Sequence, residues 1–264
     1  MKLQGVVVEP VTATVDGHCE IEAVPGSRGV VVLSGGGNVS IDVGADADLT
    51  VVSLQESDTE GRHEAVVGRD AHYRHVAVAF GSRVRLQACA AFSAPGGRAE
   101  LFGLHMTSGG QHHELRTYVD HNQPKTVSRV DYRGALQGKG ARSLWVGDVF
   151  IRREAKGIDT YESNRNLLLT DGCVAESVPN LEIETGDIVG AGHSSVTGHF
   201  DEEQLFYLES RGIEPEEARR LVVRGFFAAI LAKIGIADVE TRLLARVDAE
   251  LAAAAHPHSD KENS

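Results

Sequence analysis

The stretch HELRTYVDHNQPKTVSRVDYRGAL, residues 113–136, shows how most of this chain is built. Leu115 and Val119 alternate with Glu114 and Arg116, which is the two-residue period of a strand with one buried face. A second strand-like run, TVSRVDYRGAL, follows after a short asparagine-containing turn. The stretch therefore predicts two short strands in succession, with no helix between them.

The same pattern extends outward over roughly the first 200 residues. Short runs rich in Val, Ile, Leu and Thr are separated by Gly, Asp or Asn turns, as in GVVVLSGGG, NVSIDVG, ADLTVVSLQ, HVAVAFG, AELFGLHM, SLWVGDVFI, NLLLTDG and LEIETGDIV. A dozen such strands fit a sandwich, a barrel or a β-solenoid. Few Asn-Gly or Asp-Gly hairpin turns separate them, which favours the solenoid, although spacing alone leaves all three open.

The hydrophobic period changes near residue 200. Asp201 and Gln204 form a capping-box pattern for a helix that stops at Gly212, and Pro215 opens a second helix that ends at Gly235. A third helix covers ADVETRLLARVDAELAAAA, residues 237–255, with Val239, Leu243 and Val247 on one stripe. We therefore expect a strand-rich core over residues 1–199, a helical domain over 200–255 and a disordered tail over 256–264.

The second of these helices has apolar residues on more than one side. Ala218, Leu221 and Ile230 follow the helical period, and Val223 and Phe227 add a second apolar side. Packing on a single surface does not need that second side. We predict that it marks a protein partner.

Composition and charge exclude several classes of protein. The chain of 264 residues has 26 Lys and Arg against 38 Asp and Glu, a formal charge of −12, which argues against nucleic-acid binding. No apolar run reaches the roughly 18 residues of a membrane helix, and MKLQGVVVEP lacks a signal-peptide core. Cys19, Cys89 and Cys173 are an odd, widely spaced set that gives neither a disulfide framework nor a zinc module. We expect a cytoplasmic protein.

The short motifs of catalysis are weak. The glycines 35–37 are not followed by Lys-Ser/Thr, so they predict a turn and not a phosphate loop, and no GxSxG occurs. His112 and His113 point to opposite faces of a strand, so we expect them and His121 to be surface or turn residues and not a metal site. His193 and His199 share a parity but stand about 20 Å apart in a straight strand, and from the residues alone His193 is either a ligand or an ordinary exposed histidine.

Three longer stretches carry a more specific signal. They are QHHELRTYVDHNQPKTVSRVDYRGALQGKGA, GIDTYESNRNLLLTDGCVAESVPNLEIETGDIVGAGHSSVTGHFDEEQLFYLESRGI and EEARRLVVRGFFAAIL. Together they make the segment from about Gln111 to Ile234 resemble the SufB/SufD family of iron-sulfur cluster assembly proteins, closest to the SufD branch of actinobacteria. The preceding strands resemble the same family more weakly.

The resemblance implies a fold and a set of partners. The fold is a right-handed parallel β-helix followed by a small helical C-terminal domain, which agrees with the change of period at residue 200. SufB would pair with the β-helix, and one copy of the ATPase SufC would dock on the helices. Without SufB, a homodimer is the other possible state. The chain would then be a scaffold subunit without turnover of its own.

The resemblance also implies site residues. His193, in the pattern GAGHSSVTG, would be a ligand of a transient iron-sulfur cluster shared with SufB at their interface. Reduced FAD is implied for the complex but for no residue of this chain. The partner-binding set predicted on the helices is Phe206, Tyr207, Arg211, Val223, Arg224 and Phe227.

Departures from the family pattern keep other functions open. Ala191 occupies a position that is cysteine in some SufD relatives, and the SufB sulfur-accepting cysteine has no counterpart in NRNLLLT. One alternative is a β-helix polysaccharide lyase or hydrolase, although Glu182, Glu184 and Asp187 form only a local acidic group. Another is a non-catalytic interaction module derived from SufD.

Overall fold

The computed structural model describes residues 1–6, 9–199, 202–235 and 237–255. This part of the chain forms strands first and helices last. The strands are β1 (Lys2–Leu3), β2 (Val11–Ala23), β3 (Arg28–Val43), β4 (Asp48–Gln55), β5 (Thr59–Val67), β6 (His72–Ala79), β7 (Arg83–Phe92), β8 (Arg98–Thr107), β9 (His112–His121), β10 (Val127–Leu136), β11 (Arg142–Ile151), β12 (Ile158–Leu168), β13 (Val174–Ile183) and β14 (Ile188–His199). The helices are α1 (Glu202–Ser210), α2 (Pro215–Leu231) and α3 (Ala237–Ala255).

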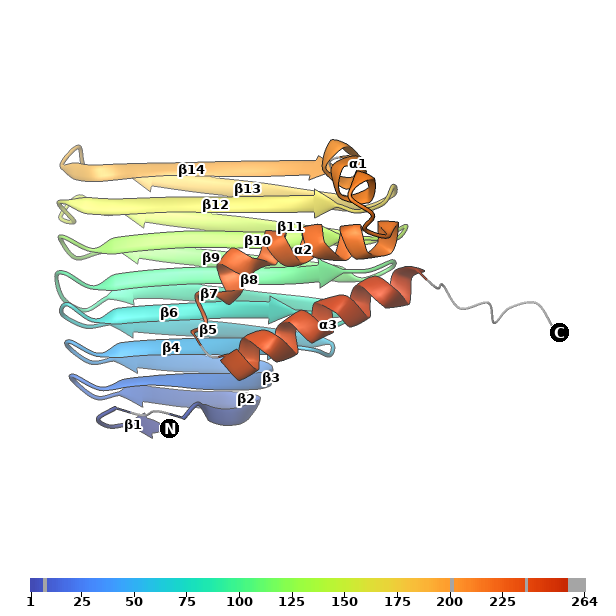
Figure 1. Ribbon diagram of the computed structural model, residues 1–264. Coiled ribbons are helices and arrows are strands. Elements are labelled where there is room, and N and C mark those ends of the chain that lie inside the picture. Colours follow the sequence, from blue (N-terminus) through green and yellow to red (C-terminus); the bar gives the residue numbers. More distant parts are fainter. Residues whose placement is uncertain (7–8, 200–201, 236, 256–264) are drawn as a thin grey trace.

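The strands wind into a solenoid with two strands in each turn. Every pairing is parallel, and from β5 to β12 each strand pairs with the strands two before and two after it in the chain. The even-numbered strands β4 to β14 therefore stack into one sheet, and the odd-numbered strands β5 to β13 into the other (Figure 1). This arrangement confirms the predicted parallel β-helix and excludes the sandwich and barrel built from antiparallel hairpins.

The long strand β3 joins the two sheets at their N-terminal end. Its first part, Arg28–Ser34, pairs with β4, and its last part, Gly37–Val43, pairs with β5. Where the two parts meet, Gly35 and Gly37 have φ of +87° and +138°, values that L side chains rarely adopt. The glycine run predicted as a turn is thus the corner at which the chain passes from one sheet to the other.

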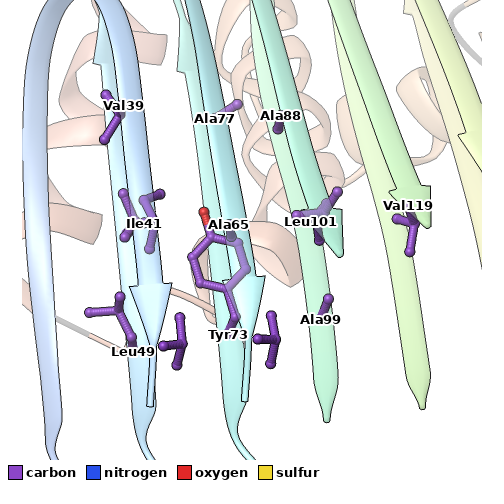
Figure 2. Packing of buried hydrophobic residues seen from close by; sticks show 14 of the residues in the cluster. Val39, Ile41, Leu49, Ala65, Tyr73, Ala77, Ala88, Ala99, Leu101 and Val119 are labelled. Carbon is purple, nitrogen blue, oxygen red and sulfur yellow. The ribbon is translucent and has the colours of Figure 1, made fainter. Parts of the chain in front are cut away.

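One side chain of every two along each strand fills the space between the sheets. In β9 the burial alternates strictly, with His113, Leu115, Thr117, Val119 and His121 buried, as the sequence pattern predicted. Figure 2 shows part of this interior, with Val39, Ile41, Leu49, Ala65, Tyr73, Ala77, Ala88, Ala99, Leu101 and Val119 in stacked rows. Tyr73 and Tyr132 are 1% exposed and Trp145 is 2% exposed. The interior is a packed core and not a channel.

Replacing Gly103 with alanine is expected to destabilise the solenoid by about 2 kcal/mol or more, as overpacking does. A Cβ atom at Gly103 would overlap the ring of Tyr132 on the next turn, and that ring is 1% exposed and has no free space to move into. Chemical denaturation of the variant measures the effect. The matched control is Gly225→Ala on the exposed side of α2, where a Cβ meets nothing within 4 Å and alanine should be neutral or stabilising by up to about 1 kcal/mol. Equal stability of the two variants would contradict the packing described.

The three helices occur where the sequence predicted them. Gly212 and Gly235 have φ of +84° and +69°, and Pro215 stands in the first turn of α2. The proposed N-cap Asp201 and the tail 256–264 lie outside the described residues. Helices α2 and α3 lie across the outer face of the even-numbered sheet (Figure 1), and they share one hydrophobic cluster with β4, β6, β8 and β10.

That shared cluster corrects the interpretation of the second apolar side of α2. Val223 and Phe227 are both 0% exposed and belong to the cluster that contains Phe102 and Leu104 of β8. The outer face of the even-numbered sheet is itself apolar, so it needs an apolar helix to cover it. Their hydrophobicity therefore serves the contact with this chain's own sheet, and their side chains are not on the surface.

Among the described residues, no helix is long and apolar enough to cross a membrane.

Candidate functional site at the open end of the solenoid

The last turn of the solenoid, formed by β13 and β14 and here called the open rung, is covered on one side only. β13 pairs with β11 and β14 pairs with β12, and no described strand pairs with their outer edges. The two strands lie together at one end of the stack (Figure 1). Their backbone N–H and C=O groups on that edge, and their inward-facing side chains, are open to solvent or to a partner.

Large apolar side chains are exposed in and beside the open rung, on both sheets. Six large ones between residues 161 and 196 are from 38% to 76% exposed: Tyr161, Val174, Val178, Ile183, Val189 and Val196. Exposed apolar surface of this kind next to an unpaired strand edge is typical of a surface that another protein covers.

His193 lies in the middle of the open rung and faces the solenoid interior. It is the direct neighbour of Glu162 on β12, and neighbouring residues of paired parallel strands point to the same side of a sheet. Its Nδ1 atom is 3.8 Å from Oε1 of Glu162, and its side chain is 47% exposed. The structure thus places the predicted ligand where it is accessible from the open end, and its ligand role stays a prediction.

β14 is one continuous strand through His193 to His199. The sharp bend needed to bring both histidines to one ion is therefore not formed. Ala191 lies opposite Thr160, two residues before His193 and on the same inward side. In the described part of the chain no three His, Cys, Asp or Glu side chains come together to hold a metal ion, so this chain offers only part of a metal site at His193.

Glu162 is the functional candidate that sequence reasoning missed. Its side chain is fully buried, and neither carboxylate oxygen has a hydrogen-bond partner among the described residues. Burial, with a smaller contribution from the nearby charge of Asp148, raises its pKa to about 8. The sequence contains one signal of this site: in ESNRN, the polar residues Glu162, Asn164 and Asn166 occupy every second position, on the face of the strand that is buried.

The interior becomes polar next to this glutamate. Asn164 donates to the carbonyl oxygen of Tyr132 at 3.2 Å and accepts a hydrogen bond from Ser177 of β13 at 2.5 Å. Asn166 donates to Asn164 at 2.7 Å and to Thr197 of β14 at 3.3 Å. The apolar core of the earlier turns is thus replaced at the open end by a hydrogen-bonded polar layer that links β12, β13 and β14.

Several other histidines are structural, which corrects the expectation of surface or turn positions. His112 is exposed and His113 is fully buried, so the opposite orientation of this pair is confirmed. His113 Nε2 donates to the carbonyl oxygen of Gly81 at 2.6 Å, and His121 bridges Thr126 and Ser128 at 2.7 and 2.9 Å. Their ring nitrogens are used in hydrogen bonds inside the solenoid.

The cysteines lie apart from the predicted ligand in the chain. Cys89 is buried, and burial raises the pKa of its thiol to about 11. Cys19 is half-buried. Cys173 is also half-buried, in the turn before β13, with its sulfur 3.4 Å from the carbonyl oxygen of Gly138.

The residues predicted to bind a partner through the helices fall into two groups. Phe206 and Tyr207 of α1 are 74% and 57% exposed, and the guanidinium of Arg211 lies 5.1 Å from the centre of the Tyr207 ring. These three residues are here called the α1 patch, and Figure 1 shows α1 beside the end of β14. Val223 and Phe227 are buried, and Arg224 is 3.8 Å from Asp248 of α3.

The described chain is thus a parallel β-helix with an uncovered last turn, an accessible histidine at the mouth of that turn and helices packed on one face. Residues 13–226 match the family model described as the SufBD core domain of the SUF system for FeS cluster assembly. The chain therefore belongs to the SufBD family of iron-sulfur cluster assembly proteins.

Individual relatives support the family and its SufD-like character. A SufBD family protein of Mycobacterium bovis is 51% identical over 93% of this chain and 68% of its own length. The iron-sulfur cluster assembly protein SufD of Escherichia coli is 26% identical over 82% of this chain and 52% of its own length. SufD of Bacillus subtilis is 30% identical over 53% of this chain and 32% of its own length. The chain thus spans about two thirds of the mycobacterial relative.

Proposed function

We propose that this chain is a SufD-like scaffold subunit that assembles with a SufB-like subunit and a SufC-like ATPase and holds a nascent iron-sulfur cluster between subunits. The observation that carries the proposal is the open rung, because it combines an unpaired strand edge, exposed apolar side chains and an accessible histidine in one place. The cluster is the cargo of this assembly. The chain itself would have no turnover.

The SufB-like subunit is proposed to cover the open rung. A strand of the partner can add to the unpaired edge of β14 through main-chain hydrogen bonds, and its apolar side chains can cover Tyr161, Val189 and Val196. His193 would then lie at the interface between the two subunits. A neutral imidazole nitrogen is a good ligand for ferrous iron, and thiolates of the partner would supply the softer ligands.

The ATPase is proposed to dock on the α1 patch. Phe206 and Tyr207 give an exposed aromatic pair, and Arg211 adds a cation stacked on one of the rings. Aromatic and Arg side chains are the residue types that dominate binding energy in protein interfaces. The position of α1 directly after β14 would let a movement of the ATPase reach the open rung.

Two further features of the proposal concern the setting of the complex. We place the protein in the cytoplasm, where a reducing environment keeps its free cysteines and its cargo reduced. The reduced flavin implied for such complexes is assigned to no residue of this chain, and a hollow beside β5, β7 and β9 does not suit it, because that hollow is lined mainly by charged side chains such as Glu60, Arg85 and Glu114. No step of the proposed function is assigned to it.

Replacing His193 with alanine is expected to lower the iron and sulfide content of the co-expressed complex several-fold without releasing any subunit. The reason is that the imidazole is accessible, and its contact with Glu162, at 3.8 Å, is too long for a hydrogen bond that would support the fold. The experiment co-expresses this chain with the SufB-like and SufC-like proteins of the same genome, purifies on this chain, and measures bound iron and sulfide. His199→Ala, on the same strand, is the matched control and should keep its cluster.

Two results would count against the proposal. If the three wild-type proteins do not co-purify, the scaffold role is wrong, and the chain acts as a separate interaction module. If they co-purify and His193→Ala keeps a full cluster, the scaffold role stands and the ligand role is wrong.

A further inference from the structure

We propose that Glu162 is a second metal donor of this chain and forms, with His193, a two-donor site for a divalent cation at the mouth of the solenoid. The identification of the cation as ferrous iron rests on the proposed function. The pair itself rests on the geometry of β12 and β14, which place both side chains on the inward face as direct neighbours.

The buried Glu162 carboxylate lacks a hydrogen-bond partner in the described part of the chain, and a bound cation would stabilise it. A buried carboxylate with no hydrogen bond to either oxygen is strongly unfavourable, and unsatisfied buried groups of this kind mark functional sites or places where an ion binds. Glu162 is 0% exposed, and neither Oε1 nor Oε2 has a hydrogen-bond partner. Within the described ranges, the basic side chain paired with it is that of His193.

Packing fixes the direction of this carboxylate. Gly147 of β11 leaves room for it, since a Cβ at that position would lie 2.5 Å from Oε2. The ring of Trp145 borders the same space. Oε2 is therefore held against β11, while Oε1 points across to His193 of the open rung.

The spacing of the two donor atoms suits one shared cation. The 3.8 Å from His193 Nδ1 to Glu162 Oε1 is too long for a hydrogen bond. Metal–nitrogen and metal–oxygen bonds are each about 2.1 Å, so one ion can contact both atoms with an angle of about 130° between them. A small rotation of either side chain brings this angle near to the value for tetrahedral or octahedral coordination.

The remaining coordination positions would face the open end. No third His, Cys, Asp or Glu of the described chain joins the pair, and Ala191, the inward neighbour of His193 on β14, offers no donor. Water, or donors of a subunit that covers the open rung, would complete the coordination. The pair is thus a half-site that can take up a cation before a partner encloses it.

Binding of Co²⁺ to the purified, oxygen-free chain tests the pair, because bound Co²⁺ absorbs visible light and reports its donor atoms. We expect one Co²⁺ per chain, competed by Fe²⁺, with the affinity lowered roughly tenfold or more by Glu162→Gln and by His193→Ala. The double variant should lose little more than the weaker-binding single variant, as two donors of one site do. Glu182→Gln, an exposed carboxylate of β13, is the control and should bind as the wild type does.

The outcomes separate this inference from the proposed function. No Co²⁺ binding by the wild type, or an unchanged affinity and spectrum in Glu162→Gln, overturns the donor pair, whatever the co-purification with SufB-like and SufC-like proteins shows. Failure of co-purification with intact Co²⁺ binding overturns the scaffold role and leaves the pair. Should Glu162→Gln not fold, Glu162→Met replaces it, since an apolar isostere is tolerated where a buried carboxylate is removed.

Discussion

Acidification from pH 7 to pH 4 is expected to unfold the solenoid in one steep transition, well before most carboxylates are protonated. His63, His113 and His121 are buried, and desolvation lowers the pKa of each to about 4, and that of His105 to about 3. In the unfolded chain these groups titrate near pH 6.5. Between the two values the unfolded state binds more protons, so stability is lost as the pH falls from about 6.5 toward 4.

The size of the effect follows from the number of buried histidines. A pKa lowered by about 2.5 is equivalent to about 3 kcal/mol per histidine at pH 4, and His75, 3.0 Å from His63, is also lowered well below its usual value. Several such contributions together are comparable to the 5–15 kcal/mol that stabilises an ordinary domain. Glu162 acts in the opposite direction, because its raised pKa of about 8 means that stability is lost as the pH rises from about 4.5 to 8. Maximum stability should therefore lie near pH 6 to 7.

Urea unfolding at a series of pH values measures this dependence. His121→Gln should be less stable than the wild type at pH 7 but should show a shallower loss on acidification, because one titrating group is gone. The exposed His112 provides the control, and His112→Gln should follow the wild-type pH profile. A wild-type stability that is flat between pH 7 and pH 5 would contradict neutral, desolvated histidines in the interior.

Phe227→Ala is expected to destabilise the protein by about 3–5 kcal/mol, as for a large aromatic removed from a core. The side chain is fully buried between α2 and the outer face of the even-numbered sheet. This cluster is the main apolar contact of α2 and α3 with the sheet, beside the hydrogen bonds from Arg133 to the carbonyl oxygen of Phe226 and from Gln137 to that of Glu250. Weakening it should therefore free both helices before the solenoid unfolds. Hydrogen exchange would show faster exchange in α2 and α3, with β6 to β10 still protected.

Phe206→Ala is the matched comparison on the neighbouring helix. Its side chain is 74% exposed, so stability should change by no more than about 0.5 kcal/mol. Under the proposed function it should instead reduce co-purification of the SufC-like ATPase. If Phe206→Ala is as destabilising as Phe227→Ala, the assignment of one phenylalanine to the core and the other to the surface is wrong.

The alternation of residues predicted the strands well but not what covers them. In β9 and β10 the two-residue period is clear because one face is buried and the other is partly exposed. In β6 and β8 almost every residue is buried, because the interior lies on one side and α2 and α3 lie on the other. Such runs contain no period, so the sequence could not show that Phe227 has its partner inside the chain.

The candidate site could likewise be predicted only in part from the sequence. His193 was found through the resemblance of GAGHSSVTG to a family pattern, whereas Glu162 belongs to a different turn of the solenoid. Their proximity depends on the register in which β12 and β14 pair, which is shifted near Ile158. No local sequence pattern predicts that register. In addition, glutamate side chains are usually exposed, so the residue type gave no reason to expect Glu162 in the interior.

The two edges of the open rung differ in how they resist self-association. β13 contains Pro179, which cannot donate a hydrogen bond, and the acidic residues Glu176 and Glu182, features that natural proteins use to keep sheet edges from growing. β14, IVGAGHSSVTGH, contains neither proline nor any Asp, Glu, Lys or Arg. The edge of β14 is therefore open to pairing with a strand of a second copy as well as with a strand of the proposed partner. Under the proposed function, solubility of this protein should depend on its ratio to the SufB-like subunit, and a surplus of free chain should convert to dimers or aggregates.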